Sequence, residues 1–126
     1  MELINTVGPG KMAVQPLLSV NTTSQGTTQI VVVAGELDVA SIDQVGAVID
    51  RALSAEPETL LLDLSQIGFC DSSGVHLVLR THRRAQGGRT RLRVIPPTGT
   101  ARRVFDICCV EDYVTFVTAD ELRAAG

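Results

Sequence analysis

The sequence predicts an α/β fold: a mixed, mostly parallel sheet of about five strands with about four helices. Short apolar runs rich in Val, Ile and Leu alternate with longer segments whose apolar residues recur at helical spacing. Only a short turn separates the first two runs, which favours a hairpin. Helical segments separate the later runs, and such crossovers connect parallel strands.

Composition limits the classes of function. The 126 residues are the length of one domain, and the core must be mainly aliphatic because 44% of residues are hydrophobic but only 3% are aromatic. The net charge of -3 gives no reason to expect direct nucleic-acid binding. We find neither a membrane-span-length apolar run nor a signal-peptide pattern, so we expect a soluble, cytoplasmic chain without a membrane partner.

The N-terminal part predicts a tail followed by a hairpin. Residues 1–15 lack periodicity and are expected to be a flexible tail, leaving residues 16–126 as the domain. Residues 17–22 alternate weakly, as an edge strand does. Residues 29–34 form a continuous β-branched run, which is typical of a central strand buried on both faces. Residues 35–38 are predicted to break that strand.

The first helix is predicted after this break. Ser41 and Gln44 have the spacing of a capping box. The helical stripe consists of Ile42, Val45, Val48, Ile49, Ala52 and Leu53. A buried strand is then expected over residues 59–64, because that run is almost entirely apolar.

The C-terminal third predicts two further strands and two further helices. Residues 89–95 alternate Leu and Val with Arg, as a strand with one wet face does. A short third helix is indicated by Ala101, Val104, Phe105 and Cys108. Residues 114–117 form a last short strand, and Thr118 with Glu121 predicts the cap of a terminal helix.

The segment Asp71-Ser72-Ser73-Gly74 lies between the strand of residues 59–64 and a helix that ends near Gly87-Gly88. Asp and Ser are preferred at helix N-termini, where backbone N–H groups are unpaired and the helix dipole is positive. A phosphate would be tolerated there. Strand-to-helix junctions gather at one edge of a parallel sheet, so we expect residues 35–38 to lie beside this segment.

A serine-dependent enzyme is an alternative. Ser72 or Ser73 lies at a strand-to-helix turn, and His76 or His82 could act as a base, but the Gly-x-Ser-x-Gly spacing is absent. No orienting acid is evident. Neither metal-ligand spacing nor a phosphate-binding glycine loop is present, so no cofactor is expected.

The arginines cluster in one part of the sequence, and the chain has three cysteines. No acidic residue lies between Ser72 and Phe105, and this window contains Arg80, Arg83, Arg84, Arg89, Arg91, Arg93, Arg102 and Arg103. We interpret these arginines as solvated faces of a helix and a strand, with an anion site as the alternative. The three cysteines fit reduced thiols. Cys108 and Cys109 are predicted to be packed small residues.

Several motifs together resemble the anti-sigma factor antagonists of the STAS-domain family. These are Gly35-Glu36-Leu37-Asp38, Leu62-Asp63-Leu64, Phe69-x-Asp71-Ser72-Ser73-Gly74 and Val104-Phe105-Asp106-Ile107. The resemblance extends from about residue 17 to the C-terminus. It implies a single STAS-like domain that binds an anti-sigma factor, usually a serine kinase of the GHKL type.

The resemblance also implies a switch. The kinase would phosphorylate Ser72, a phosphatase would reverse this, and the unphosphorylated form would capture the anti-sigma factor. The implied partner-binding residues are Glu36, Asp38, Asp71, Ser72, Ser73, Gly74 and His76. His76 departs from the family pattern, which commonly has a small residue there. An accessory subunit of a transporter is the alternative within the family.

Overall fold

The computed structural model describes residues 17–121. The sheet contains β1 (Leu18–Gln25), β2 (Thr28–Leu37), β3 (Thr59–Cys70), β4 (Arg91–Ile95) and β5 (Thr115–Phe116). The helices are α1 (Ile42–Ser54), α2 (Ser72–Gly87), α3 (Gly99–Ile107) and the 3-10 turn η1 (Val110–Asp112). A last helix begins within the described residues at positions 119–121. The predicted tail lies outside the described residues.

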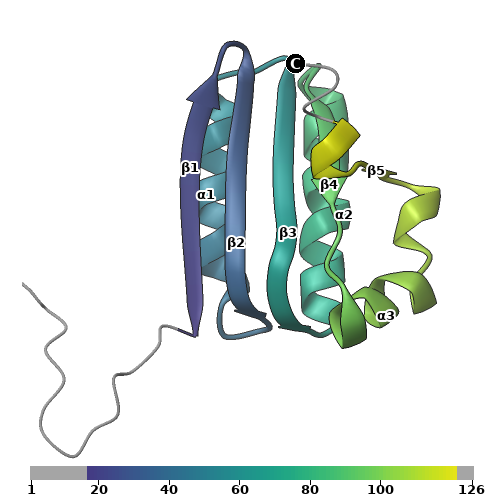
Figure 1. The fold of residues 1–126 in the computed structure, drawn as a ribbon. Helices are drawn as coiled ribbons and strands as arrows, with labels where there is room; N and C mark the ends of the chain where they lie inside the picture. Colours follow the sequence, from purple (N-terminus) through teal and green to yellow (C-terminus); the bar gives the residue numbers. More distant parts are fainter. Residues whose placement is uncertain (1–16, 122–126) are drawn as a thin grey trace, which may run out of the picture.

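The strands lie in sequence order across the sheet (Figure 1). β1 pairs antiparallel with β2, while β2, β3, β4 and β5 are parallel to one another. The predicted hairpin and the mixed, mostly parallel sheet are therefore confirmed. The helices of the β2–β3 and β3–β4 connections supply the crossovers that parallel pairing requires.

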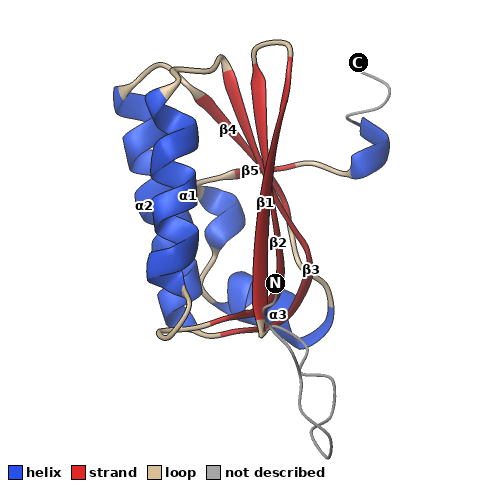
Figure 2. Cartoon of the chain, turned by 90° about the vertical axis from the view of Figure 1, so that its left-hand side faces the viewer, coloured by secondary structure: helices blue, strands red, loops and turns tan. Residues whose placement is uncertain are grey.

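α1 and α2 pack side by side on one face of the sheet (Figure 2). The core between the sheet and these helices includes side chains of β2, β3 and β4 that alternate along each strand; they are Val31, Val33, Leu60, Leu62, Leu64, Leu92 and Val94. Leu61 is also buried but lies outside this core cluster. Ile30 and Val32 are only half-buried, so the prediction that residues 29–34 are buried on both faces is wrong. The reason is that the two long helices cover one face.

The two central strands are longer than predicted. β2 continues to Leu37 and β3 to Cys70, and the two strands remain paired to the end, with Glu36 opposite Phe69 and Leu37 opposite Cys70. Gly35 therefore does not break β2. Its φ of +110° and two register shifts instead mark an irregular stretch that the paired strands accommodate.

Ser41 has a different role from the one predicted. Its hydroxyl does not cap α1 by the reciprocal pattern expected with Gln44. It donates to the carbonyl oxygen of Glu36 at 2.8 Å and accepts the N–H of Asp38 at 3.0 Å. The side chain thus fixes the β2–α1 loop, and its donor and acceptor bonds there take the place of the expected bonds to the first turn of the helix.

In the C-terminal region the predicted capping box is confirmed, but the predicted packing of two cysteines is wrong. Thr118 and Glu121 form a reciprocal capping box, with each backbone N–H donating to the other side chain at 3.0 Å. Cys108 and Cys109 are exposed, so their predicted packing is wrong. α3 ends at Ile107, and Cys109 adopts a left-handed conformation with φ of 56°, which separates α3 from η1, where Val110 is buried in the core.

Candidate functional site

The carboxyl ends of β2 and β3 bring two loops together at one edge of the sheet (Figure 1). The backbone N–H of Asp71 donates to the carbonyl oxygen of Leu37 at 3.3 Å. The loop after β2 and the start of α2 are therefore neighbours, as expected from parallel strands. These two segments define the candidate site.

Asp71 is the N-cap of α2. Its carboxylate accepts the backbone N–H of Ser73 at 2.9 Å and also accepts the Ser73 hydroxyl. The pKa of Asp71 is held below its ordinary value of 3.8, chiefly by the hydrogen bond from the Ser73 hydroxyl. Backbone N–H groups of the same turn lower it further. The carboxylate is therefore ionised at neutral pH. It accepts a backbone N–H of the first turn that has no partner within the helix.

Ser72 lies between these bonded groups but takes no part in their bonds. Its side chain is exposed, and its hydroxyl forms no hydrogen bond with any residue from 17 to 121. It is the first residue of α2, where backbone N–H groups lack partners within the helix. The Ser72 hydroxyl is thus free to meet another molecule, at a position that favours negative charge.

Gly74 is buried beneath this turn. A Cβ at Gly74 would lie 2.5 Å from Cys70 Sγ and 3.0 Å from two carbon atoms of Leu37. The Cys70 thiol donates to the carbonyl oxygen of Asp71 at 3.3 Å, and burial raises the pKa of Cys70 to about 12. The glycine therefore lets α2 start directly against the ends of both central strands.

The neighbouring loop carries two carboxylates. Asp38 Oδ1 accepts the backbone N–H of Ala40 at 3.0 Å, and its side chain is half-buried. Glu36 is exposed. A surface pocket of about 340 Å³ beside them is lined by Leu17, Leu18, Glu36, Asp38, Ala40, Ser41 and Gln44.

Exposed apolar residues surround the site, and the sequence reasoning missed them. Leu17 is 71% exposed, Val39 is 75% exposed and Phe69 is 47% exposed. The Glu36 N–H donates to Leu17 O at 2.7 Å, and Phe69 lies opposite Glu36 across the β2–β3 pair. One indication of these residues was available from the sequence, which was their position beside the β2–α1 and β3–α2 junctions. Apolar side chains gathered at one edge are typical of a protein-binding surface.

Within the described residues, the groups of the alternative serine enzyme are not joined by hydrogen bonds. His76 is exposed one turn after Ser72, and neither His76 nor His82 is hydrogen-bonded to a serine within the described part of the chain. Ser73 donates directly to Asp71 instead. Among residues 17–121 no three potential metal ligands gather, and no helix is long and apolar enough to cross a membrane.

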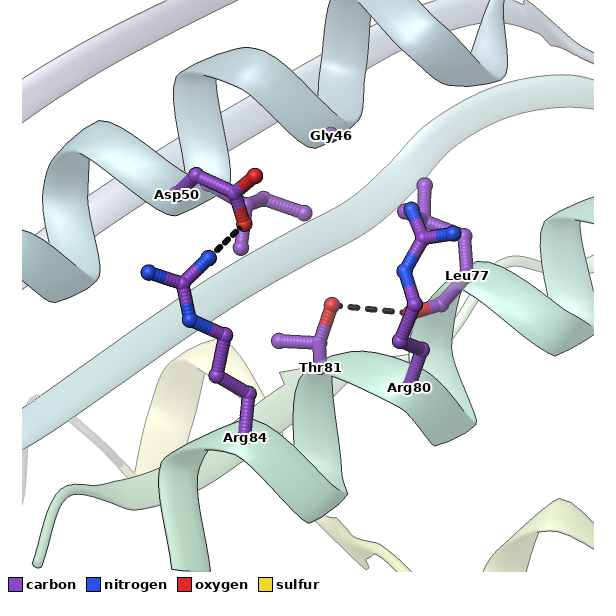
Figure 3. Close-up of a pocket in the computed structure, with 7 residues that line it drawn as sticks. Gly46, Asp50, Leu77, Arg80, Thr81 and Arg84 are labelled. Atoms are coloured by element: carbon purple, nitrogen blue, oxygen red, sulfur yellow. Dashed lines mark hydrogen bonds and ion pairs between the residues drawn. The ribbon is translucent and has the colours of Figure 1, made fainter. Parts of the chain in front are cut away.

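A second pocket, of about 170 Å³, lies between α1 and α2 (Figure 3). Arg84 pairs with Asp50 across it, and Thr81 donates to the carbonyl oxygen of Leu77 at 2.8 Å. The side chains of Arg84 and Asp50 are 48% and 60% exposed, so their pairing adds little stability. Arg84 agrees with the interpretation of the arginines as solvated residues, whereas Arg102 is half-buried, pairs with Asp106 at 2.9 Å and lies over the ring of Phe116.

Comparison with known proteins identifies the family. The profile of the STAS domain matches residues 19–124. The chain belongs to the STAS domain family. Its five-stranded mixed sheet and the order of its helices agree with that assignment.

Relatives of this STAS domain carry informative names. An anti-sigma F factor antagonist from Lysinibacillus sphaericus is 30% identical over 95 residues, which cover 75% of this chain and 81% of the relative. The solved structure of the anti-sigma factor antagonist SpoIIAA in its unphosphorylated form is 26% identical, with a TM-score of 0.69; the match covers 82% of this chain and 92% of that chain.

Two further solved structures are similar to this STAS domain. The Bacillus cell fate determinant SpoIIAA in its phosphorylated form is 26% identical, with a TM-score of 0.65, and the match covers 85% of this chain and 98% of that one. An anti-sigma factor antagonist from Mycobacterium paratuberculosis is 21% identical, with a TM-score of 0.76 and coverage of 86% and 92%. At that identity the second likeness shows the fold alone.

Proposed function

We propose that this STAS domain is an anti-sigma factor antagonist that acts in the cytoplasm. It binds an anti-sigma factor that is itself a serine kinase, and phosphorylation of Ser72 by this kinase abolishes binding until a phosphatase removes the phosphate. The observation that carries the proposal is the exposed, unbonded Ser72 hydroxyl at the start of α2. The 30% identity to an anti-sigma F factor antagonist supports the class of partner.

The two serines differ in their availability to a kinase. The Ser73 side chain is half-buried and its hydroxyl donates to Asp71, so phosphorylation of Ser73 would remove this hydrogen bond and place the phosphate charge against the Asp71 carboxylate. The Ser72 hydroxyl can be modified without the loss of any bond within the described residues. This difference favours Ser72 as the phosphorylated residue.

The proposed docking surface combines polar and apolar side chains at one edge of the sheet. It consists of Leu17, Glu36, Asp38, Val39, Phe69, Asp71, Ser72, Ser73 and His76. Gly74 is buried, so its contribution to partner binding is the shape of the turn rather than a direct contact. The exposed apolar residues supply area to bury, and the polar groups supply specificity.

Phosphorylation acts on this surface through charge and bulk. A phosphoserine adds about -1.5 to -2 charges at neutral pH. Asp71, already ionised, is the adjacent residue, so the turn becomes strongly negative. The backbone N–H groups at the start of α2 offset part of the charge within the domain, so the fold persists while docking is lost.

Mass spectrometry after incubation with the cognate kinase and ATP tests the phosphorylated residue. We expect phosphate on Ser72 and none in Ser72→Ala. Phosphate on Ser73 alone, or label retained in Ser72→Ala, would overturn the assignment. Turnover of a generic ester that is lost in Ser72→Ala would instead support an enzyme, and co-purification with a membrane complex would support a transporter subunit.

A further inference from the structure

β1 is a long, open edge of the sheet. It has eight residues, and no described element lies beside its outer side (Figure 1). We infer that this edge pairs antiparallel with β1 of a second copy of the chain, which joins the two five-stranded sheets into one. The inference does not depend on the proposed function, because it requires no other protein, and the edge adjoins the proposed docking surface only at its Leu18 end.

The β1–β2 register determines which backbone groups face outward. The N–H of Glu36 donates to the carbonyl oxygen of Leu17, so this pair is of the hydrogen-bonded type. In an antiparallel ladder such pairs alternate. The residues of β1 that bond to β2 are Ser19, Asn21, Thr23 and Gln25. The residues whose N–H and C=O groups point to the open edge are Leu18, Val20, Thr22 and Ser24.

The usual protections of an edge strand are absent from β1. Natural sheets guard exposed edges with charged side chains, proline, bulges or very short strands. β1 contains neither a charged residue nor proline, and its register with β2 is uninterrupted. No charged residue occurs anywhere in residues 12–35. The opposite edge, β5, is protected by its length of two residues.

A second copy fits this edge better than an unrelated strand for a reason of symmetry. In a twofold pair each strand faces its own sequence, so any charged residue near the axis would lie close to its like-charged mate. An axis beside Asn21 pairs Leu18 with Ser24 and Val20 with Thr22 of the second copy. The four outward residues of each copy then form eight backbone hydrogen bonds, four donated by each strand.

Sedimentation equilibrium tests the dimer over protein concentrations from about 1 to about 200 µM, a range that covers ordinary and weak association. We expect a concentration-dependent mass that reaches that of two chains. Thr22→Pro removes an outward N–H without removing a bond to β2, and proline is tolerated on edge strands in that orientation. It is expected to weaken dimerisation at least about tenfold while the melting temperature shows that the monomer still folds.

A charge variant provides the second arm in case proline distorts the strand. Thr22→Lys places a like charge on both copies and is expected to weaken dimerisation, whereas Gln86→Lys, on the exposed surface of α2, adds the same charge and is expected to leave it unchanged. A wild-type chain that stays monomeric throughout the range would overturn the inference. A dimer that survives both Thr22 variants would overturn it too, since another surface would then join the copies.

Discussion

Gly74 and Cys70 are packed so closely that a side chain on the glycine has no room. A Cβ there would lie 2.5 Å from Cys70 Sγ, well inside ordinary van der Waals contact. The glycine is the third residue of α2, the helix that begins at Ser72, and the cysteine ends β3. The contact therefore fixes the Ser72 turn against the sheet.

Gly74→Ala is expected to lower the free energy of unfolding by about 1–3 kcal/mol, because added bulk in a packed site forces its neighbours to shift. Urea unfolding measures the change. Gly87→Ala is the matched control in the same helix, since no atom lies within 4 Å of a Cβ there. Alanine should be neutral or stabilising at that position, by up to about 1 kcal/mol. Equal losses in the two variants would contradict this account of the turn.

Asp71 should make stability depend on pH in a defined direction. Its pKa is lowered in the folded state, so the ionised carboxylate stabilises the fold above the ordinary pKa of 3.8, and this contribution is lost as pH falls through the lower folded value. Asp71→Asn keeps an oxygen acceptor but cannot ionise. The stability difference between wild type and Asp71→Asn, measured by urea unfolding, should shrink at acid pH. A difference independent of pH would argue against the role of the charge.

The three thiols should separate into two classes. Cys108 and Cys109 are exposed, whereas Cys70 is buried with its pKa raised from 9.0 to about 12. The thiolate is the reactive form, so the reactive fraction of Cys70 near pH 8 is roughly a thousandfold smaller than it would be at the ordinary pKa of 9.0. With Ellman's reagent we expect two fast thiols in the native protein and a third after denaturation. A fast thiol remaining in the Cys108→Ser/Cys109→Ser variant would contradict the burial of Cys70.

Two variants of Asp38 distinguish the effect of its charge on binding from the effect of its hydrogen bond on the β2–α1 loop. Asp38→Asn removes the charge but keeps an acceptor for the Ala40 N–H, whereas Asp38→Ala removes both. If the charge contacts the partner, both variants should weaken binding of the anti-sigma factor by about tenfold, or about 1.4 kcal/mol. Calorimetric titration measures the affinity, and melting curves confirm that the domain folds. Unchanged affinity in Asp38→Asn would show that the carboxylate charge of Asp38 does not contribute to binding of the partner.

The sequence predicted element types better than it predicted their ends. Strands were expected to end at Ala34 and Leu64 because glycine and polar residues follow them. Both continue, to Leu37 and Cys70, because each strand supplies the other's backbone partners across an irregular register. Such long-range pairing overrides local composition and leaves no local signal.

The same limit applies to the site. The order of the strands allowed the two junctions to be placed together, and Asp71 has the capping position expected of it. The exposure of Val39 and Phe69 could not be predicted, because apolar residues near strand ends are usually buried. The exposure of Cys108 depends on where α3 ends, which is set by the left-handed turn at Cys109.

The affinity of the anti-sigma factor for the antagonist before and after phosphorylation at Ser72 tests the central claim most directly. Calorimetric titration should detect tight binding of the unmodified chain and of Ser72→Ala, and no measurable binding of the phosphorylated chain. Circular dichroism and melting temperature should be nearly the same in all three forms, because the helix N-terminus accommodates the phosphate. A phosphorylated chain that binds as tightly as the unmodified one would contradict the proposed switch.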